Sequence, residues 1–204
     1  SFSTASSVPT GNWVKALNDL LPASIRVLEA SEAASDFHAR KSARAKTYRY
    51  RMYRGAICPP FLARYVWHYP FPLEEDEMAE AARLVVGEHD FTSFAAVDPE
   101  RVERAEKDNH GGHGNSQGQI NDEHINVRTI FSSHWIREGE ELIYTVRGSG
   151  FLHHMVRNLV GTFLLVGKGT LTSNDFCRIL GARNRSTAGP TAPAAGLCLV
   201  GVEY

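Results

Sequence analysis

The sequence predicts an α+β fold with an antiparallel sheet, built as a ferredoxin-like βαββαβ unit. Segments whose side chains alternate with a period of two are separated by segments with a helical period. Two alternating segments are joined by a short glycine-containing turn, which is typical of a hairpin. From residue 43 onward the segments run strand, helix, strand, strand, helix, a further helix and strand. We expect residues 37–204 to form this unit, with a polar insertion at 98–122, and residues 1–36 to be the tail of a preceding similar domain.

Composition places the chain among ordinary globular proteins. Its 204 residues are 43% apolar and 22% charged, which excludes disorder, collagen and coiled coil. No apolar stretch approaches the roughly 20 residues of a membrane-spanning helix, so no membrane partner is expected. The three cysteines, Cys58, Cys177 and Cys198, are widely spaced, which argues against a disulfide framework and a zinc site. A cytoplasmic location fits this cysteine usage best.

The first elements are predicted by one helical and one extended pattern. Apolar residues recur at helical spacing from Asn12 to Leu21, and Pro22 follows them. Ser24–Ala30 is then predicted to be a short strand.

The next strand, Ala43–Tyr53, combines alternation with β-favouring residues. A period of two assigns Thr47, Arg49, Arg51 and Tyr53 to one face. The other face takes Arg44, Lys46, Tyr48, Tyr50 and Met52.

The middle of the chain is predicted to contain a helix and a hairpin. Glu74–Val86 has an acid-rich first turn that suits the positive end of the helix dipole, and Gly87 is placed to end it. Asp98–Asp122 is nearly free of apolar residues and is predicted to be a solvated loop. His124–Ile136 and Glu141–Arg147 are predicted strands, with Gly139 at their turn.

The last elements begin with the strongest helical pattern, Phe151–Val166, in which Gly161 would permit a close backbone approach. A second helix is expected at Asn174–Leu180. A loop rich in proline and alanine follows, and Gly196–Tyr204 is predicted to be the closing strand.

A strip of positive charge is the first candidate for function. The formal net charge is −1, yet no acid lies between the first and last of seven cations: Arg40, Lys41, Arg44, Lys46, Arg49, Arg51 and Arg54. Cations interleaved with aromatic residues can hold phosphates and stack an unpaired base. Long cations that merely extend to solvent from a half-buried strand would produce the same pattern, so both readings stay open.

Other polar residues allow competing readings. Arg157, one turn after His153 and His154 in the predicted helix, must find an anion, which an internal salt bridge could also supply. Asp36 and Asp90 could act as a base or nucleophile, or could cap turns. Three further histidines lack cysteines and regular ligand spacing, which disfavours a metal site: His110, His113 and His124.

Four motifs, in this order, carry a resemblance to a known family: DFHARKSARAKTYRYRMY, GEHDFTSF, GSGFLHHMVRNLVGT and RSTAGPTAPAAGLCLVGVEY. Together they resemble the tRNA pseudouridine synthase A family over essentially the whole chain. The resemblance implies the pseudouridine synthase fold and a cofactor-free isomerase. Such an enzyme converts uridine to pseudouridine in the anticodon stem-loop of tRNA, as a homodimer.

The resemblance also assigns roles to residues of this chain. Tyr48 matches the active-site tyrosine that stacks on the target base and could help remove the C5 proton. Arg157 matches the arginine that pairs with the catalytic aspartate, and Leu197 matches an apolar residue beside the uracil pocket. Further substrate contacts are expected at Arg40, Arg44, Lys46 and His154, the first three from their local chemistry.

One family feature has no counterpart in the sequence. The nucleophilic aspartate belongs to an RTDxGVHA-like motif, and no aspartate here has such surroundings. In the family this motif lies just before a segment resembling SFSTASSVPTGNWVKALNDLLP, so we expect the chain to begin after it and to be inactive alone. A non-catalytic RNA-binding module and a purely structural ferredoxin-like domain are the competing classes.

Overall fold

The computed structural model of the chain describes residues 1–97 and 126–204, which fall into two compact units, Ser1–Ala43 and Arg44–Tyr204. The first unit contains α1, Thr10–Leu20, which confirms the first predicted helix. The strand predicted at Ser24–Ala30 is wrong, because this segment pairs with no strand. Instead, the side-chain amide of Asn18 donates to the carbonyl of Val27 and its oxygen accepts the backbone N–H of Val27, at 2.8 Å each.

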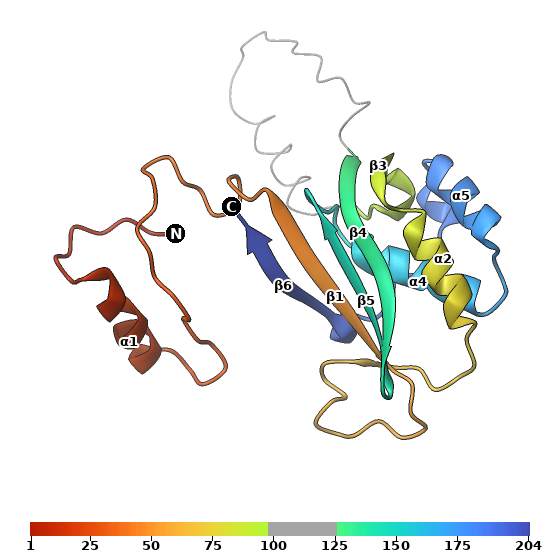
Figure 1. Cartoon of the computed structure of the whole chain (residues 1–204), viewed down its shortest axis with the longest axis horizontal. Helices are drawn as coiled ribbons and strands as arrows, with labels where there is room; N and C mark the ends of the chain where they lie inside the picture. Colours follow the sequence, from red (N-terminus) through yellow and green to blue (C-terminus); the bar gives the residue numbers. More distant parts are fainter. Residues whose placement is uncertain (98–125) are drawn as a thin grey trace, which may run out of the picture. The chain divides into compact units, whose positions relative to one another are not determined.

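A six-stranded sheet forms the frame of the second unit (Figure 1). β1, Ala45–Tyr53, lies between β5, Glu141–Gly148, and β6, Leu197–Glu203, and is antiparallel to both. β4, Val127–Glu138, follows β5, and β3, Gly87–Asp90, is antiparallel to β4. The order β6-β1-β5-β4 is that of a ferredoxin-like unit, which confirms the α+β prediction.

Two short strands extend this frame beyond the prediction. β2, Trp67–His68, adds to the end of β1 in parallel. β3 begins at Gly87, which has a φ of 109°, a backbone angle that residues with a side chain rarely adopt. The helix before it, α2, ends earlier than predicted. The predicted hairpin turn is confirmed, with Gly139 at φ 55°. The loop predicted at 98–122 and the first residues of the strand predicted from His124 lie outside the described residues.

Three helices lie together on one side of the sheet (Figure 1): α2, Glu75–Arg83; α4, Met155–Gly167; and α5, Ser173–Gly181. Most of α4 is buried. Aromatic rings form the centre of the core between α4, α5 and the sheet. Phe163 stacks on Phe176 with ring centroids 5.0 Å apart and contacts Tyr144 edge-on at 5.3 Å. Packing between these layers therefore fixes α4 against β5.

The helix α4 begins four residues later than its pattern predicts. His154 has φ 57° and ψ 4°, which is left-handed backbone, and it is the residue before the helix. The prediction that His153 and His154 belong to this helix is therefore wrong, whereas Arg157 does lie in its first turn. Hydrophobic periodicity misses this start because Phe151 and Leu152 remain partly buried outside the helix.

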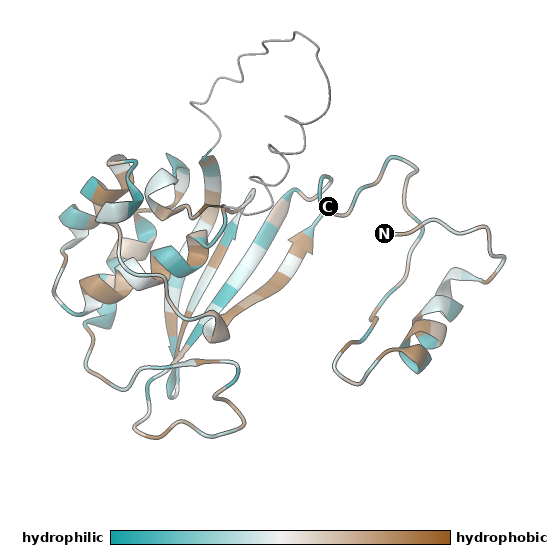
Figure 2. Ribbon diagram, turned by 180° about the vertical axis from the view of Figure 1, so that it is seen from behind, coloured by the Kyte–Doolittle hydropathy of each residue, from teal (hydrophilic) through white to brown (hydrophobic). Residues whose placement is uncertain are grey.

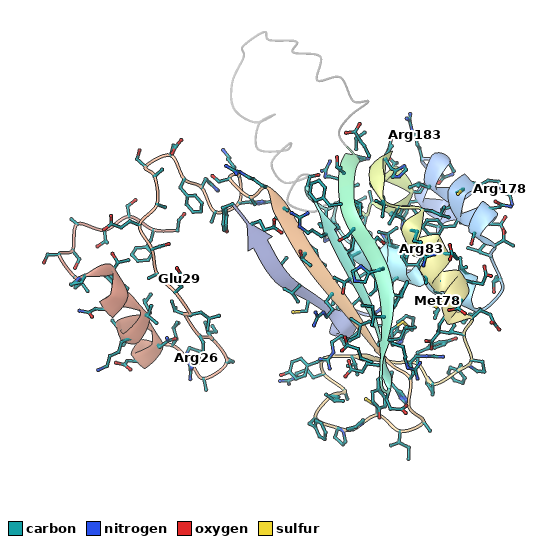
Figure 3. All side chains as sticks on the ribbon, viewed as in Figure 1. Arg26, Glu29, Met78, Arg83, Arg178 and Arg183 are labelled. Carbon is teal, nitrogen blue, oxygen red and sulfur yellow. The ribbon has the colours of Figure 1, made fainter. Side chains whose placement is uncertain are left out.

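The start of α5 gives a pH-dependent prediction. Asp175 accepts hydrogen bonds from the backbone N–H and hydroxyl of Thr172 and pairs with Arg178, which lies at the outer side of the helix (Figure 3). These bonds lower the pKa of Asp175 from 3.8 to about 2. The folded pKa lies below the unfolded one, so the stabilisation is complete above pH 3.8 and is lost as the pH falls toward 2. Thr172→Ala is expected to raise this pKa and to destabilise the chain at pH 7 more than at pH 2, as carboxyl NMR titration and denaturant unfolding would measure. An unchanged Asp175 pKa would contradict this explanation.

Candidate functional site

Tyr48 lies in the first half of β1, on the face that packs against the helices. Its partly buried ring meets Phe151 edge-on, with centroids 5.0 Å apart and planes at 80°. Burial raises the pKa of its phenol, so the hydroxyl is protonated at neutral pH. Within the described ranges this hydroxyl has no hydrogen-bond partner, which leaves it free to contact a bound molecule.

Tyr50, two residues further on the same face, connects β1 to the loop before β6. It is fully buried, and its hydroxyl donates a 2.7 Å hydrogen bond to the carbonyl of Pro193. Burial raises the pKa of Tyr50, and the positive charge of Arg157 opposes that rise. Arg157 bonds to Ala192, the residue before Pro193, and therefore lies on the same side of the sheet as Tyr50 and Tyr48.

Arg157 and Ala192 hold each other by two reciprocal hydrogen bonds. The Arg157 Nε donates to the carbonyl of Ala192 at 2.6 Å, and the backbone N–H of Ala192 donates to the carbonyl of Arg157 at 3.1 Å. Among the residues that the structure describes, no carboxylate forms an ion pair with Arg157, and its two terminal nitrogens bond to none of them. The guanidinium thus keeps a two-nitrogen fork of the kind that binds carboxylates and phosphates.

His154 directly precedes α4 and lies three residues before Arg157. Its ring stacks on His153, with centroids 4.0 Å apart. Burial first, and then the charges of His153, Arg157 and Arg185, lower the pKa of His154 below 6.5. The imidazole is therefore mostly neutral at pH 7 and can accept a hydrogen bond.

The other predicted substrate residues fall into three places. β6 places Leu197 opposite Tyr50, and β1 places Lys46 two residues before Tyr48. Arg44 is exposed just before β1, where its backbone N–H donates to the carbonyl of Glu203 at 2.7 Å. Arg40 belongs to the first unit, and its backbone N–H bonds to His38 Nδ1.

The basic strip of the sequence is divided between the two faces of β1. Arg49 and Arg51 lie on the face opposite to Lys46 and Tyr48. Arg51 makes two 2.6 Å bonds to Glu141, so its charge is compensated by an acid distant in sequence. The neighbouring strand β6 is mostly apolar: Figure 2 shows it largely in brown next to the more hydrophilic β1. Only part of the strip can therefore contribute its charge to one surface.

A polar network that the sequence analysis missed joins α4 to the loop before β6. Arg185 and Thr191 both donate to the side-chain oxygen of the fully buried Asn158, at 3.1 and 2.7 Å. The only signals in the sequence were an asparagine in an apolar helix and an arginine opening RSTAGPTAP. The close approach expected at Gly161 is confirmed, because a Cβ there would overlap the carbonyl oxygen of Pro190.

The remaining candidates do not add to this site. Asp90 accepts from the backbone and hydroxyl of Thr92 and pairs with Arg183, so it caps a turn. His110, His113 and His124 lie outside the described ranges; elsewhere no group of metal-ligating side chains is found. Within residues 1–97 and 126–204, no helix combines the length and apolarity needed to cross a bilayer.

Comparisons with known proteins agree with the fold and with the motifs. A family model described as tRNA pseudouridine synthase matches residues 111–204. A protein named tRNA pseudouridine synthase A from Solibacter usitatus is 46% identical over 203 residues, covering 100% of this chain and 74% of the relative. Proteins of the same name from Anoxybacillus flavithermus and Moorella thermoacetica are each 42% identical, covering 100% of this chain and 73% and 74% of the relatives.

Proposed function

Because the chain belongs to the tRNA pseudouridine synthase A family, we propose that the region around Tyr48 and Arg157 receives a uridine turned out of the anticodon stem-loop of tRNA. One observation carries this proposal. The ring of Tyr48 and the guanidinium of Arg157 lie on the same side of one sheet, near the start of α4. Among the described residues, neither the hydroxyl of Tyr48 nor the terminal nitrogens of Arg157 have a hydrogen-bond partner. Leu197 supplies an apolar neighbour, as a pyrimidine pocket requires.

The proposed reaction needs both groups. The bond between N1 and C1′ must break, the uracil must turn, and a bond must form between C5 and C1′; the C5 proton is then removed and N1 takes up a proton. Extruding a paired base costs a few kcal/mol, and stacking on Tyr48 is proposed to offset part of that cost. Its protonated phenol can donate a hydrogen bond to the base. No cofactor is required for this sequence of steps.

The role proposed for Arg157 is to hold the carboxylate that attacks the sugar. Since no described acid pairs with Arg157, we propose that this chain supplies the receiving side of the site and does not catalyse by itself. The same observation favours the alternative, a non-catalytic RNA-binding module of this fold. Both readings require tRNA binding on the Tyr48 face, whereas a purely structural domain does not.

Salt-dependent binding to unmodified tRNA tests the proposal. Affinity is expected to fall steeply with salt as counterions are released. Lys46→Ala should reduce the slope of log affinity against log salt by about one, as expected for a lost phosphate contact. Tyr48→Leu keeps an apolar contact for Phe151 but removes the aromatic ring. It should weaken binding by about tenfold, since stacking contributes ~1–3 kcal/mol per base, and should leave the slope unchanged.

Arg49→Ala is the matched control, because it removes a cation from the opposite face of the same strand. An Arg49→Ala effect equal to that of Lys46→Ala would mean that binding is not confined to the Tyr48 face. Absence of any tRNA binding would remove both RNA-based readings. The homodimer and the cytoplasmic location remain part of the proposal, and sedimentation with and without tRNA tests the former.

A further inference from the structure

We propose that Arg185 is a positioning residue, which holds segment 188–193 against α4 and thereby fixes the side chain of Arg157. The inference rests on the proposed function, because the fork of Arg157 is oriented for an anion of that reaction. Arg185 itself is assigned no contact with the base.

The guanidinium of Arg185 contacts four acceptors. It donates through one terminal nitrogen to the carbonyls of Ala188 and Gly189, at 3.4 and 3.0 Å. Its other terminal nitrogen donates to Asn158 Oδ1 and Thr191 Oγ1, at 3.1 and 3.2 Å. One rigid planar group therefore joins the two ends of a tight loop to the helix, which a flexible ammonium cannot do.

The helix side of this network is itself fixed. Asn158 is fully buried, and its amide nitrogen donates to the carbonyl of Phe94 at 2.7 Å, which orients the acceptor oxygen toward the loop residues. One turn later the hydroxyl of Thr162 accepts the backbone N–H of Gly189 at 2.9 Å. Buried polar groups that are hydrogen-bonded to one another in this way favour a single arrangement.

Arg157 is connected to this network through one residue. Thr191, which both Arg185 and Asn158 contact, directly precedes Ala192, and Ala192 holds Arg157 by the two reciprocal bonds. Release of segment 188–193 would remove the acceptor of the Arg157 Nε. Without it the Arg157 guanidinium can rotate, and its free fork loses its direction.

The charge of Arg185 gives a second, separable effect. All four of its acceptors are neutral, and no ion pair with an acid is found in the described ranges. Its positive charge acts on His154. Orientation of Arg157 should depend on the guanidinium fork, whereas the field at His154 should depend only on the charge.

NMR of the full 204-residue chain separates the two effects. In Arg185→Gln the solvent exchange of the Arg157 Nε–H should become at least about tenfold faster, as expected for loss of a charge-assisted hydrogen bond. The pKa of His154 should rise. In Arg185→Lys the exchange should also become faster, while the His154 pKa should stay near that of the unchanged chain. Unaltered Arg157 exchange in folded Arg185→Gln would overturn the inference.

Two further variants guard against a general loss of stability. Thr172→Ala weakens α5 outside the site and should leave Arg157 exchange unchanged; if it accelerated exchange equally, the effect would not be positional and the inference would fail. If Arg185→Gln does not fold, Thr191→Val tests the inference instead. This variant keeps the positive charge of Arg185 and removes the hydroxyl that bonds to Arg185 and Asn158 next to Ala192. It must accelerate Arg157 exchange without moving the His154 pKa. Failure of the unchanged chain to bind tRNA would contradict the proposed function. The exchange measurements would still test whether Arg185 positions Arg157.

Discussion

Replacing Gly161 with alanine is expected to lower the thermal unfolding midpoint of the chain by about 4–8 °C. An added Cβ would overlap the carbonyl oxygen of Pro190, which is backbone and is held in place by the network of Arg185. Overpacking costs about 3 kcal/mol at such a position, and the better helix propensity of alanine returns about 1 kcal/mol. The net loss of about 2 kcal/mol corresponds to that shift for a chain of this size.

Gly181→Ala is the matched control for this experiment. Gly181 also lies in a helix, at the end of α5, and an added Cβ there would meet no atom within 4 Å. Its midpoint should be unchanged or slightly higher. Thermal unfolding followed by circular dichroism measures both variants, and equal midpoints would show that the loop does not press on α4.

A polypeptide of these 204 residues is expected to form no pseudouridine in unmodified tRNA, although it is expected to bind that tRNA. It carries no RTDxGVHA-like motif, and in the described ranges no carboxylate pairs with Arg157. Release of tritium from uridine labelled at C5 would measure the reaction with high sensitivity. The Solibacter usitatus relative, assayed in parallel, is the positive control.

Each of the three possible outcomes of these measurements is informative. Release of tritium above background by the purified chain would mean that another of its acids attacks the sugar, and the proposed division of roles would be wrong. Binding without release agrees with a receiving half-site. Binding lost together with release would leave only the structural reading.

Much of the fold follows from local patterns in the sequence. The alternation of β1 and the hairpin of β4 and β5 are long enough for their period to be unambiguous, and their order already specifies the ferredoxin-like arrangement. β2 and β3 are only two and four residues long, so they carry no measurable period. They exist because an edge of β1 and an edge of β4 lie next to them.

The site is less accessible to such reasoning. Tyr48, Arg157 and Leu197 were predicted by resemblance to a family, not by their own pattern. The network of Arg185 joins residues 27 positions apart in the chain, so its members become neighbours only after the loop has folded onto α4. Strand alternation did predict that Lys46 shares a face with Tyr48. It could not predict which cations form ion pairs with acids that are distant in the sequence.

The backbone of His154 determines which replacement can isolate the contribution of its imidazole. Left-handed geometry costs most residues about 1–2 kcal/mol, and asparagine and glycine tolerate it best. An alanine substitution would therefore combine the loss of the ring with a distorted entry into α4, and would overstate the contribution of the imidazole to binding. Asparagine and glycine at this position both keep the turn, so a comparison of the two changes only what the side chain offers to the nucleotide that we propose binds here.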